Sequence, residues 1–316
     1  MKSLFSFFSK VLKKFWFNKS TPSCIRGAAI SGCVKTQVVR GAVMKGTGIE
    51  LSVAIPMFRA KYIGWLPLEG LIRQKNINFK WELVIMEELK DETFGEKNIR
   101  AYEERLKKVG CVRVLYKGLK NWIPLSNKWV GLANMCDTHS RIFVPHAADN
   151  YSSPLRLSRH YEVFKNDKVH MHIPTKAIYY NISTGKTILH DTSLVGRKDD
   201  CAARAMTTDA VRRLPKIGKR AGVDGWLRVA VRDVIGKGVF KIFFDKENNN
   251  WKSGLNTYGL NIIMNRKEFK TLKPPFTKCP IKIENNIPKD VLVRLNKCKE
   301  LVKNHKRGFP KGPNKK

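Results

Sequence analysis

The chain has 316 residues, of which 42% are hydrophobic and 10% aromatic, so it can bury a full core and is not a mostly disordered protein. Lys and Arg total 61 against 26 Asp and Glu, which gives a formal net charge of +35. No fold requires this excess. It indicates either attraction to a polyanion, such as DNA or an anionic membrane, or the compositional bias of a lysine-rich genome.

Cysteine usage indicates a reducing compartment. Seven cysteines are scattered along the chain and never form a CxxC pair. This pattern favours free thiols in a cytosol-like environment and excludes both a zinc knuckle and a disulfide framework.

Residues 1–20 predict an amphipathic basic helix. Apolar and aromatic side chains recur there at helical spacing, and lysines occupy much of the remaining surface. The helix either lies on a membrane surface or docks on its own domain or a partner. No apolar run approaches the roughly 20 residues that span a bilayer. The expected location is therefore the cytoplasm (the host cytoplasm if the gene is viral), either free or peripheral on a membrane. Residues 21–47 have no clear period and predict a linker.

Residues 48–166 alternate between buried strands and helices. Strands are predicted at 48–56, 81–87, 111–116 and 141–145, and helices at 62–74, 95–110 and 126–140. Alternation at this length predicts βαβ units with right-handed crossovers, hence a Rossmann-like, mostly parallel α/β sheet flanked by helices. Ligands of such sheets bind beyond the carboxyl ends of the strands.

After residue 166 the pattern changes. Antiparallel strands are predicted at 168–174 and 177–191, with a turn at 183–186, followed by helices at 206–213 and 223–236. An amphipathic helix beginning near Pro288 and a basic tail at 306–316 complete the chain. We therefore expect a main domain at 48–245, containing a small antiparallel β element, and a basic helical C-terminal extension at 246–316.

The order of short motifs resembles family 2 glycosyltransferases. LSVAIPMF is similar to the family's first strand, LIRQ to the end of its first helix, and WELVIMEE to a strand that runs into paired acids. GLANMCDTHSRIFVPHAAD stands where the family has a helix, a strand and an Asp-x-Asp metal motif, and VDGWL stands where it has an acidic motif near the acceptor. The resemblance covers roughly residues 48 to 236 and rests on the order and spacing of the motifs.

This resemblance implies a glycosyltransferase A-type fold and transfer of a sugar from a nucleoside diphosphate sugar to a hydroxyl, with inversion. The positions that match donor-binding residues are Pro56, Glu87, Lys128, Asn134 and Asp149. Asp224 of VDGWL is the predicted general base, because inverting transfer needs a group that removes the acceptor's proton. The alternative for Asp224 is a helix N-cap.

The metal motif departs from the family. Where the family has Asp-x-Asp-Asp, this chain has His146, Ala147, Ala148 and Asp149. We expect a divalent cation, Mn²⁺ or Mg²⁺, held by Asp149 with help from His146 or His190. Alternatively, basic side chains stabilise the leaving diphosphate.

Two acceptors fit the sequence. One is a membrane or cell-surface glycan; the other is DNA carrying hydroxymethylated bases, as in some bacteriophages, and the compact basic chain favours a viral origin. A third hypothesis is a catalytically silent glycosyltransferase-like fold that serves as a nucleic-acid-binding module. The sequence sets neither the sugar, nor the nucleotide base, nor the oligomeric state.

Overall fold

The computed structural model describes residues 48–89, 92–181, 184–192, 203–217, 223–245, 260–263, 276–279 and 287–303. The chain divides into two units, Met1–Met44 and Lys45–Lys316, and every described residue belongs to the second. The predicted helix at 1–20, the linker at 21–47 and the tail at 306–316 lie outside the described residues.

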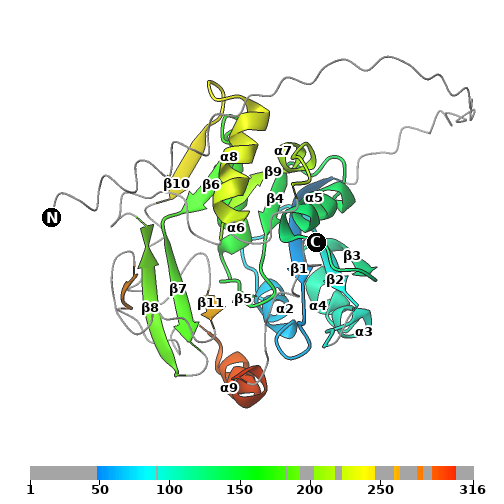
Figure 1. Ribbon diagram of the computed structural model, residues 1–316, viewed down its shortest axis with the longest axis vertical. Coiled ribbons are helices and arrows are strands. Elements are labelled where there is room, and N and C mark those ends of the chain that lie inside the picture. The colour runs from blue at the N-terminus through cyan, green and yellow to red at the C-terminus, as the bar shows by residue number, and fades with distance from the viewer. Residues whose placement is uncertain are drawn as a thin grey trace, which may run out of the picture. The chain divides into compact units, whose positions relative to one another are not determined.

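A seven-stranded sheet forms the centre of this unit (Figure 1). In spatial order its strands are β10 (Ile242–Asp245), β6 (Met171–Pro174), β9 (Ala205–Thr207), β4 (Ile142–Pro145), β1 (Ile49–Met57), β2 (Lys80–Glu88) and β3 (Cys111–Leu119). β9 runs antiparallel to its neighbours β4 and β6, and every other pair is parallel. The sheet is therefore mostly parallel, which confirms the predicted fold class.

Successive side chains of the central strands bury against opposite faces. In β1, Val53 and Ile55 pack into one hydrophobic cluster, whereas Ala54 packs into a second cluster with Val84 and Met86 of β2. A sheet covered on both faces requires apolar residues at odd and even positions alike, because strand side chains alternate in direction. This explains why these strands are continuous apolar runs in the sequence.

Helices cover both faces of the sheet. The first cluster includes side chains of α2 (Trp65–Leu71), α3 (Glu96–Arg100), α6 (Arg156–Phe164) and α4 (Glu103–Lys107). The second cluster includes side chains of α5 (Leu125–Met135), α7 (Thr208–Arg212) and α8 (Val223–Ile235). Within the described residues, no helix combines the length and the apolar character that crossing a bilayer requires.

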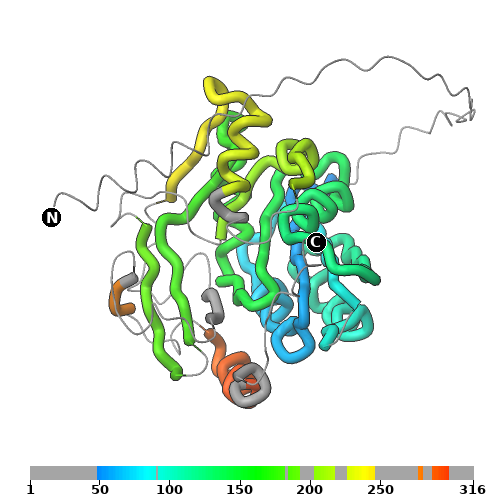
Figure 2. The backbone as a smooth tube through the Cα atoms, viewed as in Figure 1, coloured from blue at the N-terminus to red at the C-terminus, as the bar shows by residue number. Residues whose placement is uncertain are grey.

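A second sheet contains the β7–β8 hairpin, two adjacent green traces in Figure 2. Its strands, in spatial order, are β12 (Phe276–Lys278), β8 (Lys186–Asp191), β7 (Lys176–Asn181), β11 (Leu260–Ile263) and β5 (Asn150–Tyr151). The hairpin confirms the predicted antiparallel element. The predicted C-terminal helix is α9 (Lys289–Lys303). Val291 and Leu295 of this helix, and Ile287 just before it, join the first hydrophobic cluster.

Some elements differ from the expectation. The helix predicted at 95–110 is split into α3 and α4 by a tight turn in which Tyr102 N donates to Ile99 O, three residues back. The strand predicted at 168–174 does not join the β7–β8 hairpin: β6 lies in the large sheet, between β9 and β10. α6, β5, β9, β10, β11 and β12 were not predicted.

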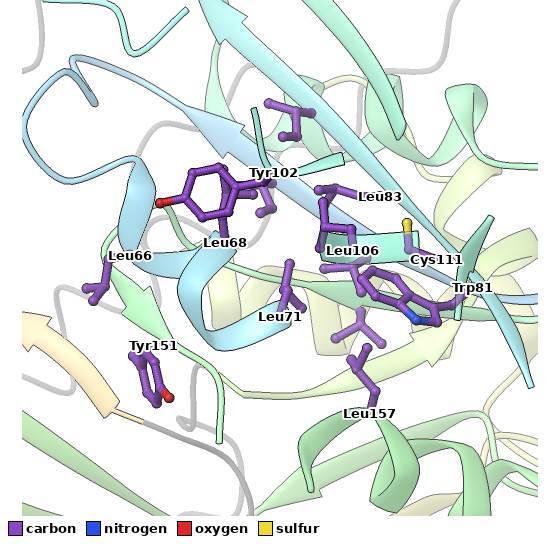
Figure 3. Packing of buried hydrophobic residues seen from close by; sticks show 14 of the residues in the cluster. Leu66, Leu68, Leu71, Trp81, Leu83, Tyr102, Leu106, Cys111, Tyr151 and Leu157 are labelled. Carbon is purple, nitrogen blue, oxygen red and sulfur yellow. The ribbon is translucent and has the colours of Figure 1, made fainter. Parts of the chain in front are cut away.

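The helix α2 lies against β5 at Gly70. Figure 3 shows Leu68 and Leu71 of this helix among the buried side chains, with Leu83 of β2 nearby. A Cβ atom at Gly70 would lie 2.5 Å from the backbone nitrogen and 2.8 Å from the carbonyl oxygen of Ser152. Backbone cannot move aside as a flexible side chain can, so this contact requires glycine.

Replacing Gly70 with alanine should lower the free energy of unfolding by about 1–3 kcal/mol, the usual cost of overpacking a close contact. The measurement is urea unfolding followed by circular dichroism. Gly238→Ala is the matched control, because a Cβ at Gly238 meets nothing within 4 Å. Equal stability of the two variants would contradict this packing.

Candidate functional site

In the large sheet, the strands β1, β2, β3 and β4 end side by side. Met57 at the end of β1 is in register with Glu87 of β2, which is in register with Gly118 of β3. Pro145 at the end of β4 is in register with Ala54. We call the carboxyl ends of these four strands the carboxyl edge. Parallel α/β sheets bind their ligands at this position. Pro56, predicted to bind donor, is partly buried at this edge, beyond the residues of β1 that pair with β4.

Glu87 is fully buried at the carboxyl edge. Its Oε1 accepts a hydrogen bond from Phe94 N at 2.6 Å, and its Oε2 accepts from Gly95 N at 2.9 Å and from the Tyr116 hydroxyl at 3.0 Å. Burial, together with this carboxylate, raises the pKa of Tyr116. Because both oxygens are occupied by protein donors, Glu87 holds the 92–95 loop in this structure. Its predicted contact with the nucleotide stays a prediction.

Glu88 and Lys128 form a buried ion pair beside Glu87. Their side chains are 1% and 4% exposed, and Lys128 Nζ contacts Glu88 Oε1. Burial lowers the pKa of Lys128, and the Glu88 carboxylate opposes that shift. The ammonium also lies 5.6 Å from the ring centroid of Phe58, and the Arg59 guanidinium lies 5.4 Å from the same ring. Lys128 is therefore at the carboxyl edge, within a group of cationic and aromatic side chains.

Two loops, residues 58–64 and 92–95, interlock at this edge; we call them the rim loops. Lys61 N donates to Glu92 O at 2.8 Å. A Cβ at Gly64 would lie 2.7 Å from Cγ of Phe94, so the two loops are in close contact. Since Glu87 holds Phe94, one buried carboxylate fixes both loops.

The turn after β4 carries two of the predicted metal ligands. Asp149 is partly exposed in a turn closed by Asn150 N donating to Ala147 O at 3.2 Å. His146 is fully buried, with Nδ1 2.9 Å from Ala147 O and Nε2 2.6 Å from Ser152 Oγ. Burial lowers its pKa well below the usual value. Asp149 thus lies at the end of β4, as predicted, whereas both ring nitrogens of His146 bond within the protein.

The third predicted metal ligand, His190, lies in β8 of the second sheet. Strands β7 and β11 separate β8 from β5, which follows Asp149 directly. Within the part of the chain that the structure describes, no group of three or more His, Cys, Asp or Glu side chains could hold a metal ion. The predicted combination of His146, Asp149 and His190 is therefore not assembled here.

Asn134 lies away from the carboxyl edge. The helix α5 begins at that edge, where Lys128 contacts Glu88, and ends at the opposite edge, where Asp137 N donates to Glu82 Oε1 at 2.7 Å. Asn134 is exposed near this second end. The structure thus does not bring Asn134 together with Lys128, and its role at the donor stays a prediction. Asp224 lies in the first turn of α8, and its side chain is outside the described residues.

A buried polar chain, not predicted from the sequence, links α6 to β6 and β10. His160 Nδ1 lies 3.0 Å from His172 Nδ1, and His172 Nε2 lies 3.3 Å from Asp245 Oδ2. Arg159 Nε donates to the same Oδ2 at 2.8 Å. The carboxylate can only accept, so His172 donates from Nε2 and accepts at Nδ1 from the Nδ1–H of His160. The helix that carries His160 is not among the predicted elements, so no sequence pattern indicates this chain.

Comparison with known proteins finds likeness in structure only. No family profile and no curated protein matches the sequence. The S. aureus TarS structure has a TM-score of 0.48 at 10% identity, over 68% of this chain and 37% of that one. TarS 1–349 in complex with UDP-GlcNAc has a TM-score of 0.49 at 8% identity, over 71% of this chain and 62% of that one. The mannosyltransferase PcManGT from Pyrobaculum calidifontis, in complex with GDP-Man and Mn²⁺, has a TM-score of 0.46 at 11% identity. The match covers 69% of this chain and 57% of that one.

This chain spans less than two thirds of the length of each of these structures. Likeness at this level concerns the α/β architecture and transfers neither a ligand nor a site residue.

The buried histidines predict acid sensitivity. Burial lowers the pKa of both His160 and His172 below the ordinary value of 6.5, so the fold favours their neutral forms. The unfolded chain takes up protons first, and stability that is fully present above pH 6.5 should fall as the pH drops below it. Each histidine contributes a slope of about 1.4 kcal/mol per pH unit. The measurement is urea unfolding across this range.

His172→Asn should flatten that slope, while His139→Asn, at a histidine whose side chain is 61% exposed, should leave it unchanged. An unchanged slope in the His172 variant would refute the assignment.

Proposed function

We propose that the chain is a glycosyltransferase that takes a sugar from a nucleoside diphosphate sugar. The observation that carries the proposal is the group at the carboxyl edge, where Lys128 pairs with Glu88 beside Phe58 and Arg59. Cations suit a diphosphate and an aromatic ring suits a nucleobase, and parallel sheets bind ligands at this edge. The order of family 2 motifs along the chain supports the same conclusion.

In the proposed reaction Asp224 accepts the proton of an acceptor hydroxyl. The acceptor oxygen forms its bond to the anomeric carbon while the bond from that carbon to the diphosphate oxygen breaks, so the configuration inverts. The nucleoside diphosphate leaves with the bonding electron pair. Lys128 and Arg59 offset the negative charge that develops on it.

Asp149 is the proposed site of a divalent cation, Mn²⁺ or Mg²⁺. The described residues do not form a cage of protein ligands, but a single carboxylate suits a cation that takes its other ligands from substrate phosphates and water. When bound, such a cation would stabilise the leaving diphosphate. Of the other predicted ligands, His146 is engaged by Ser152, and His190 lies in β8, which β7 and β11 separate from β5.

The donor site is tested by thermal unfolding with UDP, GDP, ADP and CDP, each with and without Mn²⁺. A ligand at about a hundred times its dissociation constant should add about 2.7 kcal/mol of stability. We expect one nucleotide to stabilise the protein and Mn²⁺ to increase the effect. Asp149→Asn should remove the Mn²⁺ increment, and Asp167→Asn, at an exposed acid paired with Arg141, should keep it. A folded sample that no nucleotide stabilises would favour the silent nucleic-acid-binding fold.

The acceptor is proposed from the charge of the chain. A net charge of +35 suits a polyanionic acceptor or surface, either DNA with hydroxymethylated bases or a glycan precursor on an anionic membrane. In the first case a flipped base would present its hydroxyl to the site. In the second, residues 1–20 would lie on the leaflet.

Liposome flotation separates these two acceptors. If the acceptor is on a membrane, the full chain should float with anionic vesicles and a chain lacking residues 1–20 should not. If it is DNA, duplex binding should weaken steeply as salt rises and should not need residues 1–20. If the chain binds neither anionic vesicles nor duplex DNA, the proposal of a polyanionic acceptor is wrong.

A further inference from the structure

Arg294 of α9 lies across the start of α2. Its guanidinium carbon is 4.2 Å from the ring centroid of Trp65, the first residue of that helix. Nη1 donates to the Tyr102 hydroxyl at 3.0 Å and lies 3.6 Å from Glu69 Oε1. A guanidinium stacked on an indole is held in both position and orientation, because its planar face meets the ring while its N–H groups bond at the edge.

A second contact joins the same two helices. Arg73, just after α2, donates to Asp290 of α9 at 2.6 Å and also pairs with Glu69. Beneath these polar groups, Val291 and Leu295 of α9 are buried in the first hydrophobic cluster with Leu66 of α2. The predicted C-terminal extension is therefore part of the main domain at this helix.

Trp65 connects this contact to the rim loops. Its Nε1 donates to Tyr62 O at 2.9 Å, within the 58–64 loop. The same loop bonds to the 92–95 loop through Lys61 N and Glu92 O and packs on Phe94 at Gly64. Trp65 is thus linked to both rim loops by its own bond to Tyr62 and by the hydrogen bond and close packing between the loops.

We propose that Arg294 is a positioning residue for the donor site: by clamping Trp65 it holds the rim loops in the arrangement that binds the nucleotide. The inference rests on the proposed function for the identity of the ligand, but the clamp itself rests on the contacts of Arg294, Trp65 and Tyr62. In this proposal Arg294 acts through Trp65 and not by contact with the nucleotide. Its effect should appear in donor affinity and in the protection of the rim loops.

The test compares Arg294→Ala, Arg294→Lys and Lys297→Ala in the full chain. Lys297→Ala is the matched control, because it removes an exposed cation from the same helix. Binding of UDP, GDP, ADP and CDP is measured by calorimetry, and hydrogen exchange is measured at the amides of Lys61 and Gly64. We expect Arg294→Ala to raise the dissociation constant about tenfold, equivalent to about 1.4 kcal/mol. Exchange at both amides should accelerate in this variant, and Lys297→Ala should match the wild type in both measurements.

Arg294→Lys keeps the cation over Trp65 but loses the planar fork, so its dissociation constant and exchange rates should lie between those of the wild type and Arg294→Ala. If the alanine variant does not fold, the lysine variant provides the test. Wild-type affinity and wild-type exchange in a folded Arg294 variant would overturn the proposal. If the wild type binds none of these nucleotides yet Arg294→Ala accelerates exchange, the clamp stands and the proposed donor is wrong. Faster exchange with unchanged affinity would show that the clamp does not position the site.

Discussion

The carboxyl edge depends on how two adjacent buried carboxylates at the end of β2 are compensated. An unpaired charge in a protein interior costs several kcal/mol, so neither Glu87 nor Glu88 is stable there without partners. Glu88 pairs with Lys128, and removing one member of such a pair typically costs about 3–5 kcal/mol. Glu87 instead accepts from Phe94 N, Gly95 N and the Tyr116 hydroxyl. These two solutions fix the start of α5 and the 92–95 loop, and so they set the shape of the edge.

The same compensation has a chemical consequence. Because the Glu88 carboxylate balances the single charge of Lys128, an anion at the edge also needs the positive potential of other side chains. Arg59 contributes from the 58–64 loop, where its backbone has a φ of 47°, in a region that residues other than glycine rarely adopt. A site of this kind binds an anion through the combined field of cations, which is consistent with the loss of two acids from the metal motif.

The strands of the parallel half and the later helices α8 and α9 could be predicted because a two-sided sheet and an amphipathic helix leave clear periods in sequence. The partners of the site residues could not. The sequence does not show that Glu87 accepts hydrogen bonds from the 92–95 loop. Nor does it show that Lys128 and Asn134 lie near opposite ends of α5. The helix α6 was missed because RLSRHYEVF turns Arg156 and His160 inward, so its buried face is partly polar.

The central claim is that this edge binds and breaks a nucleoside diphosphate sugar. Its most direct test is the release of labelled nucleoside diphosphate from a panel of nucleotide sugars, in the wild type and in Asp224→Asn, with folding checked by circular dichroism. The account predicts release from one nucleotide sugar by the wild type, stimulated by the true acceptor, and loss of that stimulation in the folded variant. Absence of release from every nucleotide sugar, by folded protein supplied with both glycan and hydroxymethylated DNA, would contradict it.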